Sequence, residues 1–304
     1  MKKTKVSANL SCFLAMLFWA VSFPGGEVLL ETWGTLTLLI IRYVSSIIIL
    51  LLIWGYIEGY LELKKSPWKK GIIIGSISWG LGGMLLLLGQ KLSDPVTPTI
   101  CIAMMPIFGA LTEVVFDKRK FENHLLIALI LALSGGYLAT GVKINDGSLS
   151  IGTLCCLISV TLFAWGTRST TKNLENCSSL SQTTTTLSGA AIFFILVYFA
   201  CIIFNIGETQ VGISDMKNII LLIIFCLFSL TIAQFLWIWG AGKIGVFIAS
   251  LHSNAVPFYV MIMMVLIFQD PWNWLQALGA MIVALGVIIS QNRQWYKFFL
   301  KIYN

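Results

Sequence analysis

The chain has 304 residues, of which 58% are hydrophobic and only 11% are charged, and its mean hydropathy is +0.89. A soluble domain carries about 25% charged residues to cover its solvated surface. The composition therefore excludes a soluble enzyme, a disordered regulator and an ordinary secreted domain, and it predicts an all-α integral membrane protein. The net charge of +7 comes from basic residues clustered between apolar stretches. Such clusters favour membrane orientation over a nucleic-acid partner.

Ten stretches of about 20 mostly apolar residues are long enough to cross a bilayer as helices. The first five cover residues 7–30, 33–57, 68–90, 95–116 and 123–141. The second five cover residues 150–168, 178–205, 216–240, 246–269 and 272–291. The first stretch has no small-x-small cleavage site after a short core, so we interpret it as a retained spanning helix rather than a signal peptide. The connections and tails leave no room for a separate soluble domain.

The basic residues predict the orientation of these ten spans. With the N-terminus inside, 16 Lys and Arg residues lie on one side, three lie on the other, and Arg42 falls within the second span. An extra or missed helix would scramble this alternation. We therefore expect both termini to be cytoplasmic, in a multi-pass protein of the bacterial inner membrane.

The chain also contains an internal repeat. A shift of 151 residues superposes Pro106 on Pro257, and it places spans three to five on spans eight to ten. Each half then has five helices, and an odd number inserts the second half in the opposite direction, as in many secondary transporters. We predict a first repeat over residues 1–141, an external linker over residues 142–149 and a second repeat over residues 150–304.

Several motifs in this order resemble the EamA-type ten-helix branch of the drug/metabolite transporter superfamily. They are FWAVSF at 18–23, a lone Arg42, MPIF at 105–108, LFAWG at 162–166, VPFY at 256–259 and LGAMIVALG at 278–286. The chain departs from the family in having Glu27 where a Lys is common, and in lacking the usual Gly-Glu at the ends of spans four and nine. The resemblance implies export or exchange of small metabolites through a central cavity lined by helices one, three, four, six, eight and nine.

Two ionisable residues lie within the predicted spans, where charge is expensive. Glu27 and Arg42 either form a pair that changes when substrate or a proton binds, or form a fixed structural pair. Arg42 could instead extend its side chain to the headgroups.

A mostly aromatic, weakly polar cavity is expected around them. For each aromatic side chain, packing or lipid contact is the alternative, and His252 could equally be a hydrogen-bonded core residue. The further candidates for this cavity are Trp19, Trp79, Cys101, Met105, Trp165, Gln234, Trp237, His252 and Tyr259.

Helix breakers within the predicted spans are candidate hinges, or static kinks satisfied by neighbouring helices. They are Pro24, Gly25, Gly26, Pro106 and Pro257.

The sequence contains no P-loop, no metalloprotease motif, no nucleophile elbow and no acidic metal cluster. The seven cysteines form no C-x-x-C pair, so neither zinc nor a disulfide framework is expected. We therefore expect no enzyme, no cofactor and no metal. The leading prediction is a secondary active or facilitative exporter of a small organic metabolite such as an amino acid, with protons as a candidate coupling ion. The alternatives are a nucleotide-sugar or lipid-linked-group carrier, and, more remotely, an intramembrane enzyme.

Overall fold

A computed structural model describes residues 2–118, 126–127, 130–131, 134–135, 138 and 151–291. Over these residues the chain consists of helices and short connections, with no strand. The predicted fifth span, the linker at 142–149 and the tail beyond residue 291 lie outside the described residues or only partly within them.

Seven described helices are long and apolar enough to cross a membrane. They are Lys5–Leu30, Thr35–Ile57, Trp68–Lys91, Ile151–Asn173, Ser179–Ile203, Met216–Ile244 and Leu251–Phe268. The helix pair Thr97–Ala103 and Met105–Phe116, bent by 45°, makes an eighth if it is one span. A shorter apolar helix covers Trp274–Gly286. Each of these segments falls on one of the predicted spans.

Several spans are divided into shorter elements. The first half contains α1 (Lys2–Ala20), α2 (Ser22–Leu30), α3 (Thr35–Ile57), α4 (Tyr60–Lys65), α5 (Trp68–Gly75), the π-helix η1 (Ser76–Leu81), α6 (Gly82–Lys91), α7 (Thr97–Ala103) and α8 (Met105–Asp117). The second half contains α10 (Ile151–Asn173), α11 (Ser179–Ile203), α12 (Met216–Ile223), the π-helix η3 (Ile224–Ile232), α13 (Ala233–Ile244), α14 (Val246–Ser250), the 3-10 helix η4 (Leu251–Ala255), α15 (Val256–Phe268) and α16 (Trp274–Gln291).

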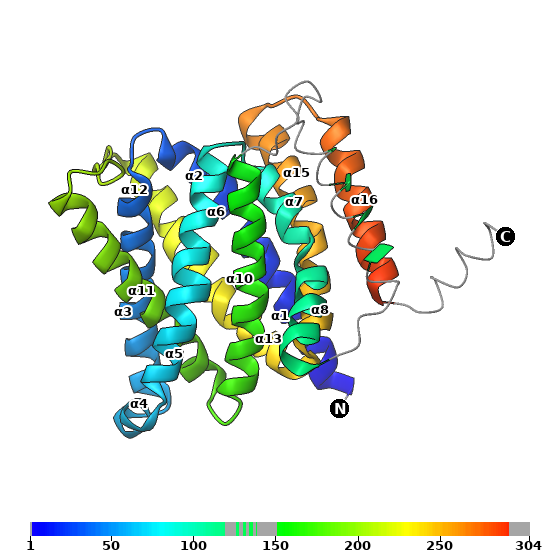
Figure 1. Cartoon of the computed structure of the whole chain (residues 1–304). Coiled ribbons are helices and arrows are strands. Elements are labelled where there is room, and N and C mark those ends of the chain that lie inside the picture. Colours follow the sequence, from blue (N-terminus) through cyan, green and yellow to red (C-terminus); the bar gives the residue numbers. More distant parts are fainter. Residues whose placement is uncertain are drawn as a thin grey trace.

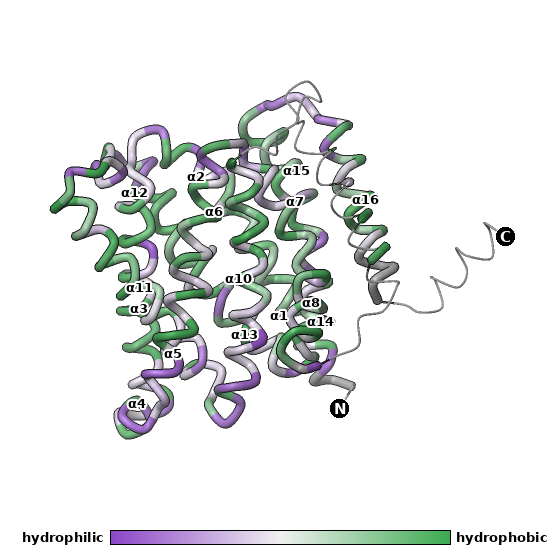
Figure 2. The backbone as a smooth tube through the Cα atoms, viewed as in Figure 1, coloured by the Kyte–Doolittle hydropathy of each residue, from purple (hydrophilic) through white to green (hydrophobic). Residues whose placement is uncertain are grey.

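The helices stand side by side, and α1 and α10 run in opposite directions (Figure 1). The connections at residues 58–67 and 174–178 lie at the lower end of Figure 1 with the start of α1, and Ser178 Oγ donates a 2.8 Å hydrogen bond to Glu58 there. The connections at 31–34, 92–96 and 204–215 lie at the upper end. Hydrophilic residues concentrate at these two ends and hydrophobic ones between them, as a bilayer requires (Figure 2).

The offset of 151 residues reappears in the backbone. The π-helix η1 ends at Leu81 and η3 ends at Ile232, and 81 + 151 = 232. Helix α8 begins at Met105 after a break, and α15 begins at Val256 after η4, and 105 + 151 = 256. Local backbone irregularities therefore occur at matching positions of the two halves.

Packing between the halves follows the same correspondence. A Cβ atom at Gly89 in α6 would collide with the Sγ of Cys156 in α10. A Cβ atom at Gly240 in α13 would collide with the Sγ of Cys12 in α1. Since 89 + 151 = 240, the two close contacts are equivalents of each other. Tyr43 in α3 also packs on Phe194 in α11, with ring centroids 4.9 Å apart, so the two halves are in contact between these helices as well.

Each predicted helix breaker lies in or beside a segment where the α-helix of its span is interrupted. The first span breaks at Val21, three residues before Pro24, and Gly25 and Gly26 are buried in α2. The fourth span breaks at Met104, two residues before Pro106, and Pro257 occupies the first turn of α15 directly after a 3-10 segment. A proline removes one backbone donor and clashes with the carbonyl four residues earlier, which accounts for these breaks. The helical hydrogen-bond pattern is therefore interrupted or changed near each proline, with a 45° bend at the fourth span. The use of these positions as hinges stays a prediction.

Candidate functional site

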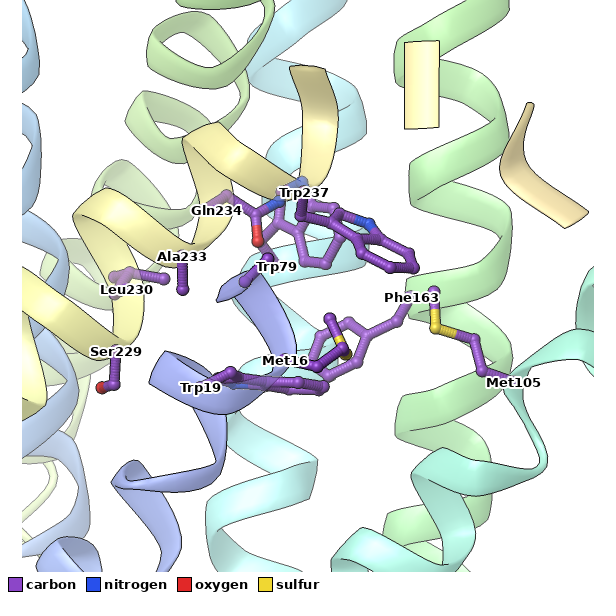
Figure 3. Close-up of a pocket in the computed structure, with 11 residues that line it drawn as sticks. Met16, Trp19, Trp79, Met105, Phe163, Ser229, Leu230, Ala233, Gln234 and Trp237 are labelled. Atoms are coloured by element: carbon purple, nitrogen blue, oxygen red, sulfur yellow. The ribbon is translucent and has the colours of Figure 1, made fainter. Parts of the chain in front are cut away.

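Two chambers lie end to end in the middle of the helical bundle. The lower chamber lies between α1, α8, α10, η1 and the η3–α13 helix, and its wall includes Met16, Met105 and Trp237. The upper chamber reaches Phe23, Arg42 and Gln90 toward the upper end of the bundle. Figure 3 shows the lower chamber, with rings and methionine side chains converging on it.

Five side chains belong to both chambers and so form the partition between them. They are Trp19, Trp79, Phe163, Leu230 and Gln234. The ring centroid of Phe163 lies 5.1 Å from that of Trp79 and 6.0 Å from that of Trp19. We call these three rings the ring layer. Trp79 and Phe163 are 6% and 4% exposed, so these two rings are packed tightly between the chambers.

The ring layer lies where the two halves of the chain meet. Trp19 comes from the first span, Trp79 from the third and Phe163 from the sixth. Trp79 and Leu230 are equivalents under the offset of 151, and both stand in the partition. Cys12 and Cys156, which meet the equivalent residues Gly240 and Gly89, are 144 residues apart. Trp19 and Phe163 are also 144 residues apart, so they are equivalents that contact each other.

The π-helices beside the chambers leave backbone carbonyls free, and the second span supplies the donors that satisfy them. Tyr43 Oη donates to the carbonyl of Trp79 in η1 at 3.0 Å. Arg42 Nη2 donates to the carbonyl of Ser229 in η3 at 3.1 Å, and Ser46 Oγ donates to that of Cys226 at 3.2 Å. One face of α3 therefore holds both π-helices in place next to the two chambers.

Arg42 lies in the wall of the upper chamber and is only 8% exposed. Its Nη2 atom also bonds to the Oγ of Ser229, and its guanidinium carbon lies 4.1 Å from the centre of the Phe225 ring. In the part of the chain that the structure describes, no carboxylate pairs with it, and its Nε has no partner. Arg42 therefore does not extend to the headgroups, and it brings positive charge to the chamber.

Glu27 is half-buried and lies behind the wall of the upper chamber. Its carboxylate accepts a 3.4 Å hydrogen bond from Gln90 Nε2, which also donates to the carbonyl of Phe23 at 2.8 Å. Gln90 lines the chamber, and Glu27 does not. The expected ion pair between Glu27 and Arg42 is wrong, because each has a different partner: Gln90 for the carboxylate, Ser229 and Phe225 for the guanidinium.

The structure brings together six of the residues singled out from the sequence. Those that line the chambers are Trp19, Arg42, Trp79, Met105, Gln234 and Trp237. Trp237 also donates from Nε1 to Thr167 Oγ1 at 3.2 Å, which fixes the indole against the sixth span.

Four other candidates lie away from the chamber walls. Cys101 is buried in the core, and Trp165 is half-buried and lines neither chamber. His252 Nε2 lies 3.2 Å from Asn9 Oδ1, and Tyr259 packs edge-on against Phe13 at 6.0 Å. These last two side chains hold the ninth span against the first.

The sequence-based selection missed Phe163, Tyr43 and Phe225. A signal for Phe163 was present, because Trp19-Ala20 aligns with Phe163-Ala164 rather than with Trp165. The indole at 165 drew attention by its residue type, although the repeat assigns the equivalent position to a phenylalanine. No pattern in the sequence indicated that Tyr43 and Phe225 reach the same chamber.

A connection at the upper end fastens the seventh and eighth spans to the second and third. The backbone N–H of Gly34 donates to Gln210 and that of Leu36 to Glu208, at 2.9 and 3.0 Å. Glu208 also pairs with Lys91 and accepts from the Thr35 N–H. Partial burial alone would raise the pKa of Glu208, but the hydrogen bonds from Lys91 and Thr35 outweigh it and hold that pKa below its usual range.

Comparison with known proteins identifies the kind of molecule that carries this site. The profile of the EamA-like transporter family matches residues 6–141 and matches again over residues 150–291. The two matches cover the two halves that the 151-residue offset relates.

One similar curated protein is described as "Uncharacterized transporter YrdR" from Bacillus subtilis (strain 168). It is 24% identical over 311 aligned residues, which cover 95% of this chain and 93% of that protein. A solved structure described only as "Crystal structure of protein" shares the fold, with a TM-score of 0.67 at 14% identity over 94% of this chain and 96% of that one.

Proposed function

Because the chain belongs to the EamA-like transporter family, and is thus a multi-pass transmembrane transporter, we propose that it moves a small organic metabolite by alternating access around the ring layer. In this proposal ten helices form two inverted five-helix repeats, with both termini in the cytoplasm of a bacterial inner membrane. The substrate leaves the lower chamber, passes the ring layer and exits through the upper chamber. The proposed direction is export, driven by a substrate or ion gradient.

The observation that supports this proposal most directly is the position of the ring layer. Two chambers on opposite sides of one aromatic partition offer a substrate two positions along a single path. The partition is built from equivalent residues of both halves, so movement of one half against the other would separate Trp19 from Phe163. Inverted repeats that meet at a central site are the arrangement by which secondary transporters alternate access.

A second candidate, a carrier of nucleotide sugars or lipid-linked groups, has less support. Among the described residues that line the chambers, Arg42 is the one cation, and a diphosphate carries more charge than it would balance.

Transport in a defined membrane tests the proposal. The purified full chain is reconstituted in proteoliposomes loaded with a panel of labelled metabolites, and efflux is compared with that from protein-free liposomes. We expect protein-dependent efflux of a subset of small organic compounds. Chemical conversion without net movement would favour an enzyme and contradict the proposal.

We propose Glu27 as the group that couples transport to protons, because it is a half-buried carboxylate that accepts a hydrogen bond from Gln90 beside the upper chamber. We expect Glu27→Gln to change the pH dependence of transport, because the amide cannot take up a proton. Asp270→Asn is the comparison at an exposed carboxylate, and it should change the pH profile less, because Asp270 acts on Glu27 only through its charge. Proteoliposome efflux between pH 5.5 and 8 measures both, and an unchanged pH profile of Glu27→Gln would make Glu27 a structural residue.

A further inference from the structure

We infer that the upper chamber binds the carboxylate of an organic anion on Arg42, with the apolar body of the anion against the ring layer. This inference rests on the proposed function, since it specifies which class of small metabolite the transporter accepts. It begins with the charge of Arg42. A guanidinium stays protonated in proteins, and a buried cation is costly unless a partner balances it.

The protein itself supplies only part of that balance. Arg42 contacts the neutral acceptors of Ser229 through Nη2 and the face of the Phe225 ring, and its Nε–H has no partner. Among the described residues that line the upper chamber there is neither an Asp nor a Glu. A ligand that brings a negative charge would therefore complete the site.

Two further buried donors in the same walls lack partners. Trp79 Nε1 and Gln234 Nε2 are unbonded within the described residues, and both side chains line the upper chamber. A buried donor without an acceptor costs free energy, so three of them around one space indicate a ligand rich in acceptor atoms. A carboxylate has two oxygens with about four acceptor sites and also has the required charge.

The rest of the chamber determines the body of the ligand. Its walls carry the rings of Trp19, Tyr43, Phe163 and Phe225, with Leu39, Leu86 and Leu87 between them. Apolar walls with a few polar groups are typical of small-molecule sites, and these rings and leucines suit a ligand body with one ring or a branched hydrocarbon. The geometry therefore points to monocarboxylates with an aromatic or branched body, and it does not require an amino group.

Matched compounds test this inference in the full-length protein. Indole-3-acetate and phenylacetate are compared with their neutral amides and with the cation tryptamine, by thermal stabilisation of the purified protein and by competition for proteoliposome efflux. We expect each carboxylate to bind at least about tenfold more tightly than its amide, because it forms charge-assisted hydrogen bonds with Arg42.

Variants separate a role in binding from a role in folding. Arg42→Gln removes the charge but also loosens η3, so Gln234→Glu provides an independent test that places a negative charge in the chamber. We expect Gln234→Glu to abolish carboxylate binding while the protein stays folded. Gln276→Glu makes the same chemical change at a half-buried glutamine outside both chambers and should have no effect.

The outcomes distinguish this inference from the proposed function. Equal or tighter binding of the amides or of tryptamine, or no stabilisation by either carboxylate, would overturn the carboxylate site. Protein-dependent efflux of neutral or cationic compounds in the same liposomes would leave the transporter proposal standing. Carboxylate binding that survives Gln234→Glu unchanged would also overturn the site.

Discussion

Residues that are close in the sequence can lie in different environments around the chambers. Phe163 and Trp165 are two residues apart on one helix, yet Phe163 closes the partition and Trp165 lines neither chamber. Arg42 and Tyr43 are adjacent, and each reaches a π-helix of a different half. The role of a side chain here depends on which half of the bundle it faces.

Trp237 allows a test of the lower chamber at this scale. Trp237→Phe keeps a ring in the wall and removes the indole donor to Thr167. We expect the variant to fold and to bind substrate several-fold more weakly, since the wall of the chamber changes shape. Trp165→Phe is the control at a half-buried indole outside the chambers. Binding measured by thermal stabilisation should be unchanged in the control, and equal affinity in both variants would remove Trp237 from the site.

Glu208 allows a pH test of the connection at the upper end. Its pKa is lowered in the folded protein, so its contribution to stability is present above the unfolded-state pKa of about 4.3 and is lost as the pH falls through the lower folded value. Because the pair with Lys91 is one-third exposed, we expect a loss of at most about 1 kcal/mol. Glu208→Gln should unfold at a lower temperature than wild type at pH 7 and at the same temperature near pH 3. A difference that persists unchanged at pH 3 would show that Glu208 acts by packing.

Helix pairs of the two halves pack through small residues, and this explains how the bundle holds together in lipid. Lipid tails are as apolar as the helix surfaces, so close backbone contact rather than burial of apolar area drives association. The third span approaches the sixth at Gly89 and Cys156, and the eighth approaches the first at Gly240 and Cys12. The third helix of each half therefore packs against the first helix of the other half.

Alanine substitutions test this equivalence of elements. Gly89→Ala and Gly240→Ala each place a methyl group against a cysteine sulfur of the facing helix. We expect both to destabilise the protein by about 1–3 kcal/mol, because the helices must separate. Gly109→Ala, where a methyl group meets no atom within 4 Å, should be neutral or slightly stabilising. Thermal unfolding of the purified variants measures all three, and equal stability of the three proteins would contradict close packing at both sites.

At the scale of the whole molecule, the topology follows from which connections lie at the same end of the bundle. The 174–178 connection lies with the start of α1, and the 204–215 connection lies at the opposite end (Figure 1). This agrees with the alternation of basic residues along the chain, which further predicts that the end with α1 is cytoplasmic.

The native Cys177 makes this orientation measurable. Cys177 is half-buried in the 174–178 connection, whereas a cysteine introduced as Gly207→Cys would meet no neighbouring atom within 4 Å. We expect a membrane-impermeant maleimide to label Cys177 only in inverted vesicles and Gly207→Cys only in intact cells. Cys177→Ser provides the background for both. Labelling of both positions from the same side would contradict the proposed topology.

The sequence by itself determined the properties that depend on composition and on residues near each other in the chain. Apolar length placed the spans that fall within the described residues, and prolines marked the helix breaks. The 151-residue offset between Pro106 and Pro257 located matching irregularities of the backbone. The family prediction is also confirmed, because the motifs that carry it are local in sequence.

The tertiary structure alone decided which side chains share a chamber. Arg42 and Phe225 are 183 residues apart, and Tyr43 and Phe194 are 151 apart, so their contacts depend on how the two halves pack rather than on any spacing within one helix. The same packing separates Arg42 from Glu27, although both lie near one end of adjacent spans. Helix periodicity assigns a residue to a face of its helix, and only the arrangement of the neighbouring helices determines what that face contacts.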